Sequence, residues 1–142
     1  MLRDSTRYDA SSDDIAQAGA ICYWRDNEGR IEVLLVAGRW GVPKGHIESP
    51  EPSGVAASTE AFEEAGIMGI VTETSFGTFN YQKDTSRNRY TVIVQLLNVS
   101  KVADKFPENI RKPRWFALHE AVRRATQPSI RALLARLGRE NS

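Results

Sequence analysis

The stretch GHIESPEPSGVAASTEAFEEAGI, residues 45–67, decides how this chain folds and where its chemistry lies. Its first half is rich in proline and glycine, which predicts a loop, whereas its second half has the composition of a helix over about 53–65. Ser53 is expected to cap the start of this helix, and Gly66 is expected to end it in the left-handed conformation. The stretch therefore predicts an ordered loop, beginning near residue 38, that leads directly into a short helix.

Three glutamates in this helix carry negative charge that no nearby lysine or arginine neutralises. At about 100° per residue, Glu60, Glu63 and Glu64 share one face of the helix. The opposite face is expected to be buried, and it carries Val55, Ser58, Phe62 and Ala65. Like charges one turn apart destabilise a helix by roughly 0.2–0.5 kcal/mol, and residues 45–66 contain neither lysine nor arginine. The cluster is thus either a solvated acidic surface or a site for a divalent cation.

The residue types around the three glutamates favour the second interpretation. Carboxylates without cysteine ligands suit hard cations such as Mg²⁺ or Mn²⁺. Glu48 and Glu51 add two acids in the loop, and Gly45 can turn its carbonyl oxygen toward an ion. Basic residues flank the acidic stretch, and five of them are expected to bind an anionic substrate: Arg39, Lys44, Lys83, Arg87 and Arg89. A carboxylate-bound cation surrounded by bases is suited to phosphate chemistry.

Apolar runs on both sides of this stretch predict the strands of a sheet. We expect strands at residues 17–24, 31–37, 75–82, 90–99 and 113–118, and further helices at 119–125 and 129–137. The run at 90–99 is apolar at nearly every position, which is typical of a central strand covered on both faces. The order of these elements predicts an α/β domain with a central mixed sheet between helices.

Composition limits the class of protein. The chain has 142 residues, 41% of them hydrophobic, and a net charge of +1, which indicates one globular domain without the charge of a nucleic-acid or membrane binder. Its single cysteine excludes an internal disulfide. No apolar run suggests a signal peptide or a membrane span. We expect a flexible arm at 1–14, a single domain at 15–142, a cytoplasmic location and no stable nucleic-acid partner.

The opening stretch resembles the Nudix box, in which Gly is followed at fixed spacing by Glu and then by Arg-Glu-hydrophobic-x-Glu-Glu-x-Gly-hydrophobic. Eight of the nine fixed positions match, and they are Gly45, Glu51, Glu60, Ala61, Glu63, Glu64, Gly66 and Ile67. Four further segments resemble the branch of diphosphoinositol polyphosphate and diadenosine polyphosphate hydrolases. These segments are RWGVPKGHIE, FNYQK, RYTVIV and RKPRWFALHEA.

The resemblance implies a Nudix-type α/β/α sandwich that cleaves a phosphoanhydride bond with the help of Mg²⁺ or Mn²⁺. It implies that Glu60 and Glu64 are metal ligands, with Glu63 and the Gly45 carbonyl as further ligands. It also implies catalytic roles for Glu51, Glu63 and Glu64. One of the helix glutamates would activate the attacking water, and which one stays open.

One position departs from the box, because Thr59 stands where the family has arginine. In the family that arginine orients box glutamates, and threonine has no charge with which to do so. Three functions therefore stay open. The favoured one is a pyrophosphohydrolase of a small, highly anionic polyphosphate, such as a diphosphoinositol or diadenosine polyphosphate. The alternatives are a non-catalytic or weakly active binding module and an RNA 5′-end pyrophosphohydrolase.

Overall fold

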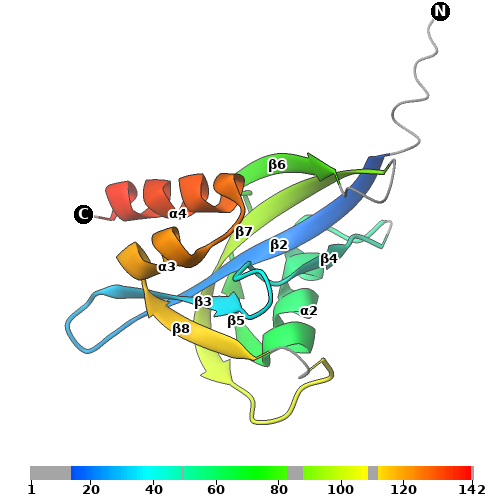
Figure 1. Cartoon of the computed structure of the whole chain (residues 1–142). Coiled ribbons are helices and arrows are strands. Elements are labelled where there is room, and N and C mark those ends of the chain that lie inside the picture. The colour runs from blue at the N-terminus through cyan, green and yellow to red at the C-terminus, as the bar shows by residue number, and fades with distance from the viewer. Residues whose placement is uncertain (1–13, 49, 83–87, 109–111, 142) are drawn as a thin grey trace, which may run out of the picture.

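The computed structural model describes residues 14–48, 50–82, 88–108 and 112–141 (Figure 1). Within them the chain forms a seven-stranded mixed sheet and three helices. The strands are β2 (Asp14–Arg25), β3 (Ile31–Val36), β4 (Lys44–His46), β5 (Ile67–Val71), β6 (Gly77–Gln82), β7 (Arg89–Val102) and β8 (Pro113–Ala117). The helices are α2 (Ser53–Ala65), α3 (Leu118–Arg124) and α4 (Pro128–Glu140).

Two long strands, β2 and β7, form the parallel centre of the sheet. Their register runs from Asp14 opposite Arg89 to Tyr23 opposite Asn98. The outer edge of β2 pairs first with β4 and then with β3, and that of β7 pairs first with β6 and then with β5. Strand β8 pairs with β3 at one edge of the sheet. The sequence correctly predicted the run within β7 as a central strand.

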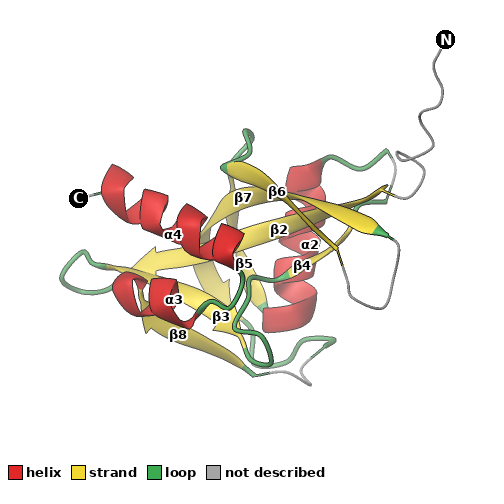
Figure 2. Cartoon of the chain, turned by 45° about the horizontal axis from the view of Figure 1, so that its top comes forward, coloured by secondary structure: helices red, strands yellow, loops and turns green. Residues whose placement is uncertain are grey.

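Helices cover both faces of this sheet, as Figure 2 shows, with α2 on one side and α3 and α4 on the other. Successive side chains of β2 point to opposite faces of the sheet, so this strand contributes to the cores on both sides. Ala20 and Cys22 belong to the core under α2, whereas Ile21 belongs to the core under α3 and α4. The predicted α/β/α sandwich is confirmed.

The α2 helix packs on the sheet through small side chains. Its buried residues are Ala56, Ala57, Ala61 and Ala65. Because the alanines are small, the helix can lie close to the sheet, and Glu60 and Glu64, which neighbour this stripe on the helix, are half-buried. Of the face expected to be buried, Ala65 is buried and Ser58 and Phe62 are half-buried, but the prediction is wrong for Val55, which is 51% exposed. The carboxylates therefore lie beside the packed face of the helix rather than opposite it.

The two ends of α2 have different anchors. The residue at the N-cap position is Pro52, and Ser53 is the first helical residue, so the predicted Ser53 cap is wrong. The Ser53 hydroxyl instead accepts a hydrogen bond of 2.9 Å from the side-chain amide of buried Gln95 on β7. Gly66 ends the helix with a φ of 70°, as predicted. The start of the helix is thus fixed to the centre of the sheet.

Two short strands were missed by the sequence interpretation. Strand β4 lies in the segment predicted as loop and exists because it pairs with β2, with Gly45 opposite Ala18. Strand β5 follows α2 directly and has a register shift at Met68 and Gly69, so it lacks a clear alternating pattern. Strand β2 begins at Asp14, within the predicted arm, and residues 1–13 lie outside the described residues. None of the described helices is long and apolar enough to cross a membrane.

The alanine contact of α2 is open to a direct test. Ala61→Leu places extra atoms at a fully buried position, and we expect it to lower the free energy of unfolding by about 1–3 kcal/mol. Urea denaturation measures the change. The matched control is Val55→Leu on the exposed side of the same helix, which should shift stability by less than about 0.5 kcal/mol. Equal effects of the two substitutions would contradict the packing described here.

Candidate active site

The site begins at a close approach between β4 and α2. A Cβ atom at Gly45 would lie 2.3 Å from the carboxyl carbon of Glu60. Real Cβ atoms do not approach other atoms this closely, so only glycine allows the Glu60 carboxylate to rest against the β4 backbone. Gly45 thereby leaves space for the Glu60 carboxylate between the strand and the helix.

Further acids gather around Glu60. Carboxylate oxygens of Glu60, Glu63 and Glu108 lie within 4.8 Å of one another. Glu108 follows β7 in the chain, and its backbone N–H donates a 2.7 Å hydrogen bond to the carbonyl oxygen of Glu63. The sequence interpretation did not predict Glu108, because it lies far from the box and no local pattern distinguishes it from an ordinary surface acid. The tertiary structure alone brings it to the site.

Glu64 lies deeper than the other acids, and its surroundings disfavour its charge. Burial, a hydrogen bond to Glu60 and the nearby charges of Glu60 and Glu108 raise the pKa of Glu64 to about 8, although Lys44 opposes this. Burial also raises the pKa of Glu60, whose carboxylate accepts the Glu64 hydrogen bond. The raised pKa values of Glu60 and Glu64 show that this pair disfavours a second negative charge.

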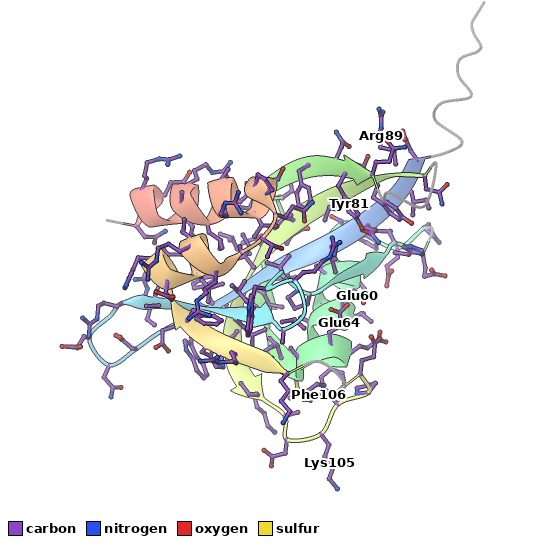
Figure 3. All side chains as sticks on the ribbon, in the orientation of Figure 1. Glu60, Glu64, Tyr81, Arg89, Lys105 and Phe106 are labelled. Carbon is purple, nitrogen blue, oxygen red and sulfur yellow. The ribbon has the colours of Figure 1, made fainter. Side chains whose placement is uncertain are left out.

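Two adjacent hollows open from this cluster. An acidic hollow of about 370 Å³ is lined by Gly45, His46, Glu48, Glu51, Ala56, Thr59, Glu60, Glu63 and Glu108. A mixed-charge hollow of about 420 Å³ is lined by Val36, Arg39, Gly41, Val42, Lys44, Glu64 and Glu108. Glu108 lines both, so the two hollows meet at this side chain. Figure 3 shows Glu60 and Glu64 on neighbouring turns of α2.

Two of the predicted substrate-binding bases line the mixed-charge hollow. The Lys44 ammonium also lies 5.6 Å from the ring centroid of Tyr81, whose hydroxyl donates a hydrogen bond to Gln17. Arg39 is exposed, and its carbonyl oxygen accepts a hydrogen bond from the Thr126 hydroxyl. The loop that carries Arg39 is therefore attached to the turn between α3 and α4.

Trp40 fixes the same loop. It has a φ of 47°, which is unusual for a bulky residue, and it packs edge-on against Phe116 with ring centroids 5.2 Å apart. A strained residue that is held by packing is typical of a loop with a functional role. The neighbouring Arg39 lines the mixed-charge hollow.

The other predicted site residues lie elsewhere. Arg89 is at the start of β7, 57% exposed, and forms an ion pair of 3.3 Å with Asp14. Lys83 and Arg87 lie outside the described residues. Glu51 lines the acidic hollow, where its side chain accepts a hydrogen bond from the Glu48 backbone. The structure thus brings Gly45, the four box glutamates, Arg39 and Lys44 together, and it leaves Arg89 apart from the two hollows.

The residues at the site fit a hard divalent cation. The clustered donors are the carboxylate oxygens of Glu60, Glu63 and Glu108, with Gly45 against the Glu60 carboxylate, and such sets suit Mg²⁺ or Mn²⁺. The missing side chain at Gly45 gives the Glu60 carboxylate space next to the β4 backbone. The crowding of like charges provides a reason for a cation to bind, because it would remove the repulsion between the acids.

Comparison with known proteins identifies the family. A family model described as NUDIX domain matches residues 16–137. The chain belongs to the Nudix family. Among its Nudix relatives, diphosphoinositol polyphosphate phosphohydrolase 3-beta of Bos taurus is 32% identical over 115 residues, and 3-alpha of Homo sapiens is 31% identical. Each alignment covers 75% of this chain and 66% of the relative, so the chain spans slightly less than two thirds of their length.

Solved structures agree with this assignment. An Ap4A hydrolase of C. elegans in a binary complex superposes with a TM-score of 0.69 and 25% identity, over 87% of this chain and 95% of that one. The NUDIX domain of Shewanella oneidensis NrtR, complexed with ADP ribose, superposes with a TM-score of 0.72 over 96% of this chain and 95% of that one. Its 15% identity supports the likeness of fold alone.

The raised pKa of Glu64 predicts how the stability of the metal-free Nudix domain depends on pH. Between about pH 4.5 and 8 the folded state keeps a proton on Glu64 that the unfolded state has lost, so the free energy of unfolding falls as pH rises through this window. Thermal melts in EDTA should show this decline. Glu64→Gln should reduce it, and added Mg²⁺ should stabilise the wild type more than the variant. A variant with the wild-type pH profile would contradict the assignment.

Because Thr59 replaces the box arginine, we expect this protein to bind a divalent cation more weakly than Nudix proteins with the full box. Thr59 is exposed and lines the acidic hollow, so an arginine there could reach the box glutamates without being buried. Because orienting groups of this kind typically change metal affinity or activity by about 10–100-fold, Thr59→Arg should lower the Mg²⁺ concentration for half-maximal rate. Thr59→Gln is the uncharged control. An unchanged or higher Mg²⁺ requirement in Thr59→Arg would show that another base already fills this role.

Proposed function

We propose that this Nudix protein is a divalent-metal-dependent pyrophosphohydrolase of a small, highly anionic polyphosphate. One observation carries the proposal: a single hollow of about 420 Å³ is lined by the acids Glu64 and Glu108 and by the bases Arg39 and Lys44. A polyphosphate needs both kinds of group, since its reacting phosphate must meet a cation while its other phosphates must meet bases. A solvated acidic surface would have no reason to open onto these bases.

The acids and the bases at the site are suited to different roles. Glu60, Glu63, Glu64 and the Gly45 carbonyl would hold Mg²⁺ or Mn²⁺, with Glu108 beside them. When bound, such a cation polarises phosphoryl oxygens and favours attack by water. Lys44 and Arg39, which line the same mixed-charge hollow, would hold the other phosphates. A box carboxylate that is not engaged as a ligand would accept the proton of the attacking water.

The wall of the mixed-charge hollow strengthens these interactions. Val36 and Val42 line it and are almost fully buried, at 6% and 5% exposed. Apolar side chains beside charged groups lower the local dielectric, so that each contact between a base and a phosphate is stronger than it would be in open water. The hollow therefore suits a substrate with several charges close together.

The names of the relatives suggest two substrate classes. The curated relatives are diphosphoinositol polyphosphate phosphohydrolases, and one structural neighbour is an Ap4A hydrolase. Both names denote compounds with several linked or clustered phosphates, which matches the bases at the hollow. We therefore propose a diphosphoinositol polyphosphate or a dinucleoside polyphosphate as the substrate.

A substrate panel tests the proposal. Purified protein with Mg²⁺ or Mn²⁺ is assayed against an inositol pyrophosphate, a diadenosine polyphosphate, ADP-ribose and triphosphorylated RNA, with Glu64→Gln as the inactive control. We expect turnover of one of the first two, reduced by orders of magnitude in the variant. Turnover of RNA alone would assign the RNA 5′-end alternative. Metal binding without hydrolysis of any compound would indicate a binding module.

The two bases of the hollow predict a pattern of kinetic effects. Arg39→Gln and Lys44→Gln should each raise KM for the polyphosphate substrate more than for ADP-ribose, because they remove contacts to the additional phosphates. Arg123→Gln on α3, whose side chain is 72% exposed, is the matched control and should leave KM unchanged. Arg89→Gln in the same assay tests the predicted role of that residue. Equal effects of Arg39→Gln on both substrates would refute the assignment of this wall to polyphosphate binding.

A further inference from the structure

The segment that carries Glu108 is attached to the end of α2 at two backbone positions. The N–H of Ala103 donates a 2.8 Å hydrogen bond to the carbonyl of Gly66, and the N–H of Glu108 donates a 2.7 Å bond to the carbonyl of Glu63. Carbonyls in the last turn of a helix have no partner within the helix, so an external donor stabilises them. Segment 103–108 therefore serves as the cap of the helix that presents the acids.

A side-chain contact lies between these two hydrogen bonds. A Cβ atom at Gly66 would lie 2.7 Å from Cδ1 of Phe106 and 2.9 Å from the carbonyl oxygen of Ala103. The ring of Phe106 thus occupies the space that any other residue at position 66 would fill. The glycine of the box is required here both for its φ of 70° and for this contact.

Phe106 differs from its neighbours in the segment. It is half-buried, whereas Lys105, Pro107 and Glu108 are exposed. Figure 3 shows Phe106 beside the end of α2 and Lys105 pointing away from the molecule. Pro107 restricts the backbone of Phe106 to extended conformations, which limits the paths by which the chain can continue to Glu108. Phe106 is thus the apolar anchor of a segment that is otherwise mostly exposed.

An anchor is needed because the cluster repels Glu108. Its carboxylate lies within 4.8 Å of those of Glu60 and Glu63, and it is also among the causes that raise the pKa of Glu64. The two backbone hydrogen bonds of the segment are a weak restraint against such repulsion. The packing of Phe106 on Gly66 supplies a restraint that does not depend on charge.

We propose that Phe106 is a positioning residue, which holds segment 103–108 on Gly66 so that Glu108 completes the metal-binding set of acids. This inference rests on the proposed metal-dependent function, but it concerns metal binding rather than the substrate. Phe106 acts through Glu108 and touches neither metal nor substrate. Loss of its ring releases Glu108 from the cluster and leaves the box glutamates in place.

Titration of the protein with Mn²⁺, followed by electron paramagnetic resonance without substrate, tests this proposal. Glu108→Gln should weaken Mn²⁺ binding by about 10-fold, and Phe106→Ala by a similar factor. The double variant should bind as weakly as Glu108→Gln alone, because both changes remove the same interaction. Phe106→Leu should retain most of the wild-type affinity for Mn²⁺. Lys105→Ala is the matched control in the same segment and should leave the affinity for Mn²⁺ unchanged.

A second measurement separates positioning from general stability. Amide hydrogen exchange in Phe106→Ala should lose protection at Glu108 while the core strands keep theirs. Unchanged Mn²⁺ affinity in Phe106→Ala, or additive losses in the double variant, would overturn the proposal. So would a wild type that binds no Mn²⁺, which would remove the metal site itself. Mn²⁺ binding that follows the expected pattern in a protein that hydrolyses no polyphosphate would refute the proposed substrate and support the role of Phe106.

Discussion

The close contact between α2 and the centre of the sheet is the constraint on which the site depends. Alanines form the contact on the helix, and the absence of a side chain at Gly45 leaves space on β4. Larger residues in place of the alanines would crowd the contact between helix and sheet, and a side chain at position 45 would displace the Glu60 carboxylate from the β4 backbone. A packing arrangement based on small residues thus sets the position of the charges.

This arrangement gives up some stability. Glu60 and Glu64 are half-buried next to one another, and burial raises the pKa of both. Replacing the acids with apolar residues would be expected to make the domain more stable, because buried like charges are unfavourable without a counter-ion. A bound divalent cation would relieve the repulsion and would supply chemistry for phosphate cleavage.

Two loops from distant parts of the chain complete the site, and each is fixed by contacts that involve no charge at the site. Trp40 holds the loop of Arg39 against Phe116, and Phe106 holds the segment of Glu108 against Gly66. Aromatic packing is suited to this purpose, because it is independent of pH and of whether the cation is bound. A cation or a substrate could therefore bind to the acids and bases and leave again, while the aromatic contacts keep the two loops in place.

The sequence by itself determined the layers of the fold, the central strand within β7, the end of α2 at Gly66 and the box residues, because these depend on local periodicity and on fixed spacing. Tertiary structure decided the rest. Strand β4 exists through its pairing with β2, the buried face of α2 was set by the alanines that fit the sheet, and Ser53 bonds Gln95 instead of capping the helix. Glu108 joined the site through a hydrogen bond across the fold. Contacts between residues distant in sequence leave no periodic trace, so only the folded chain shows them.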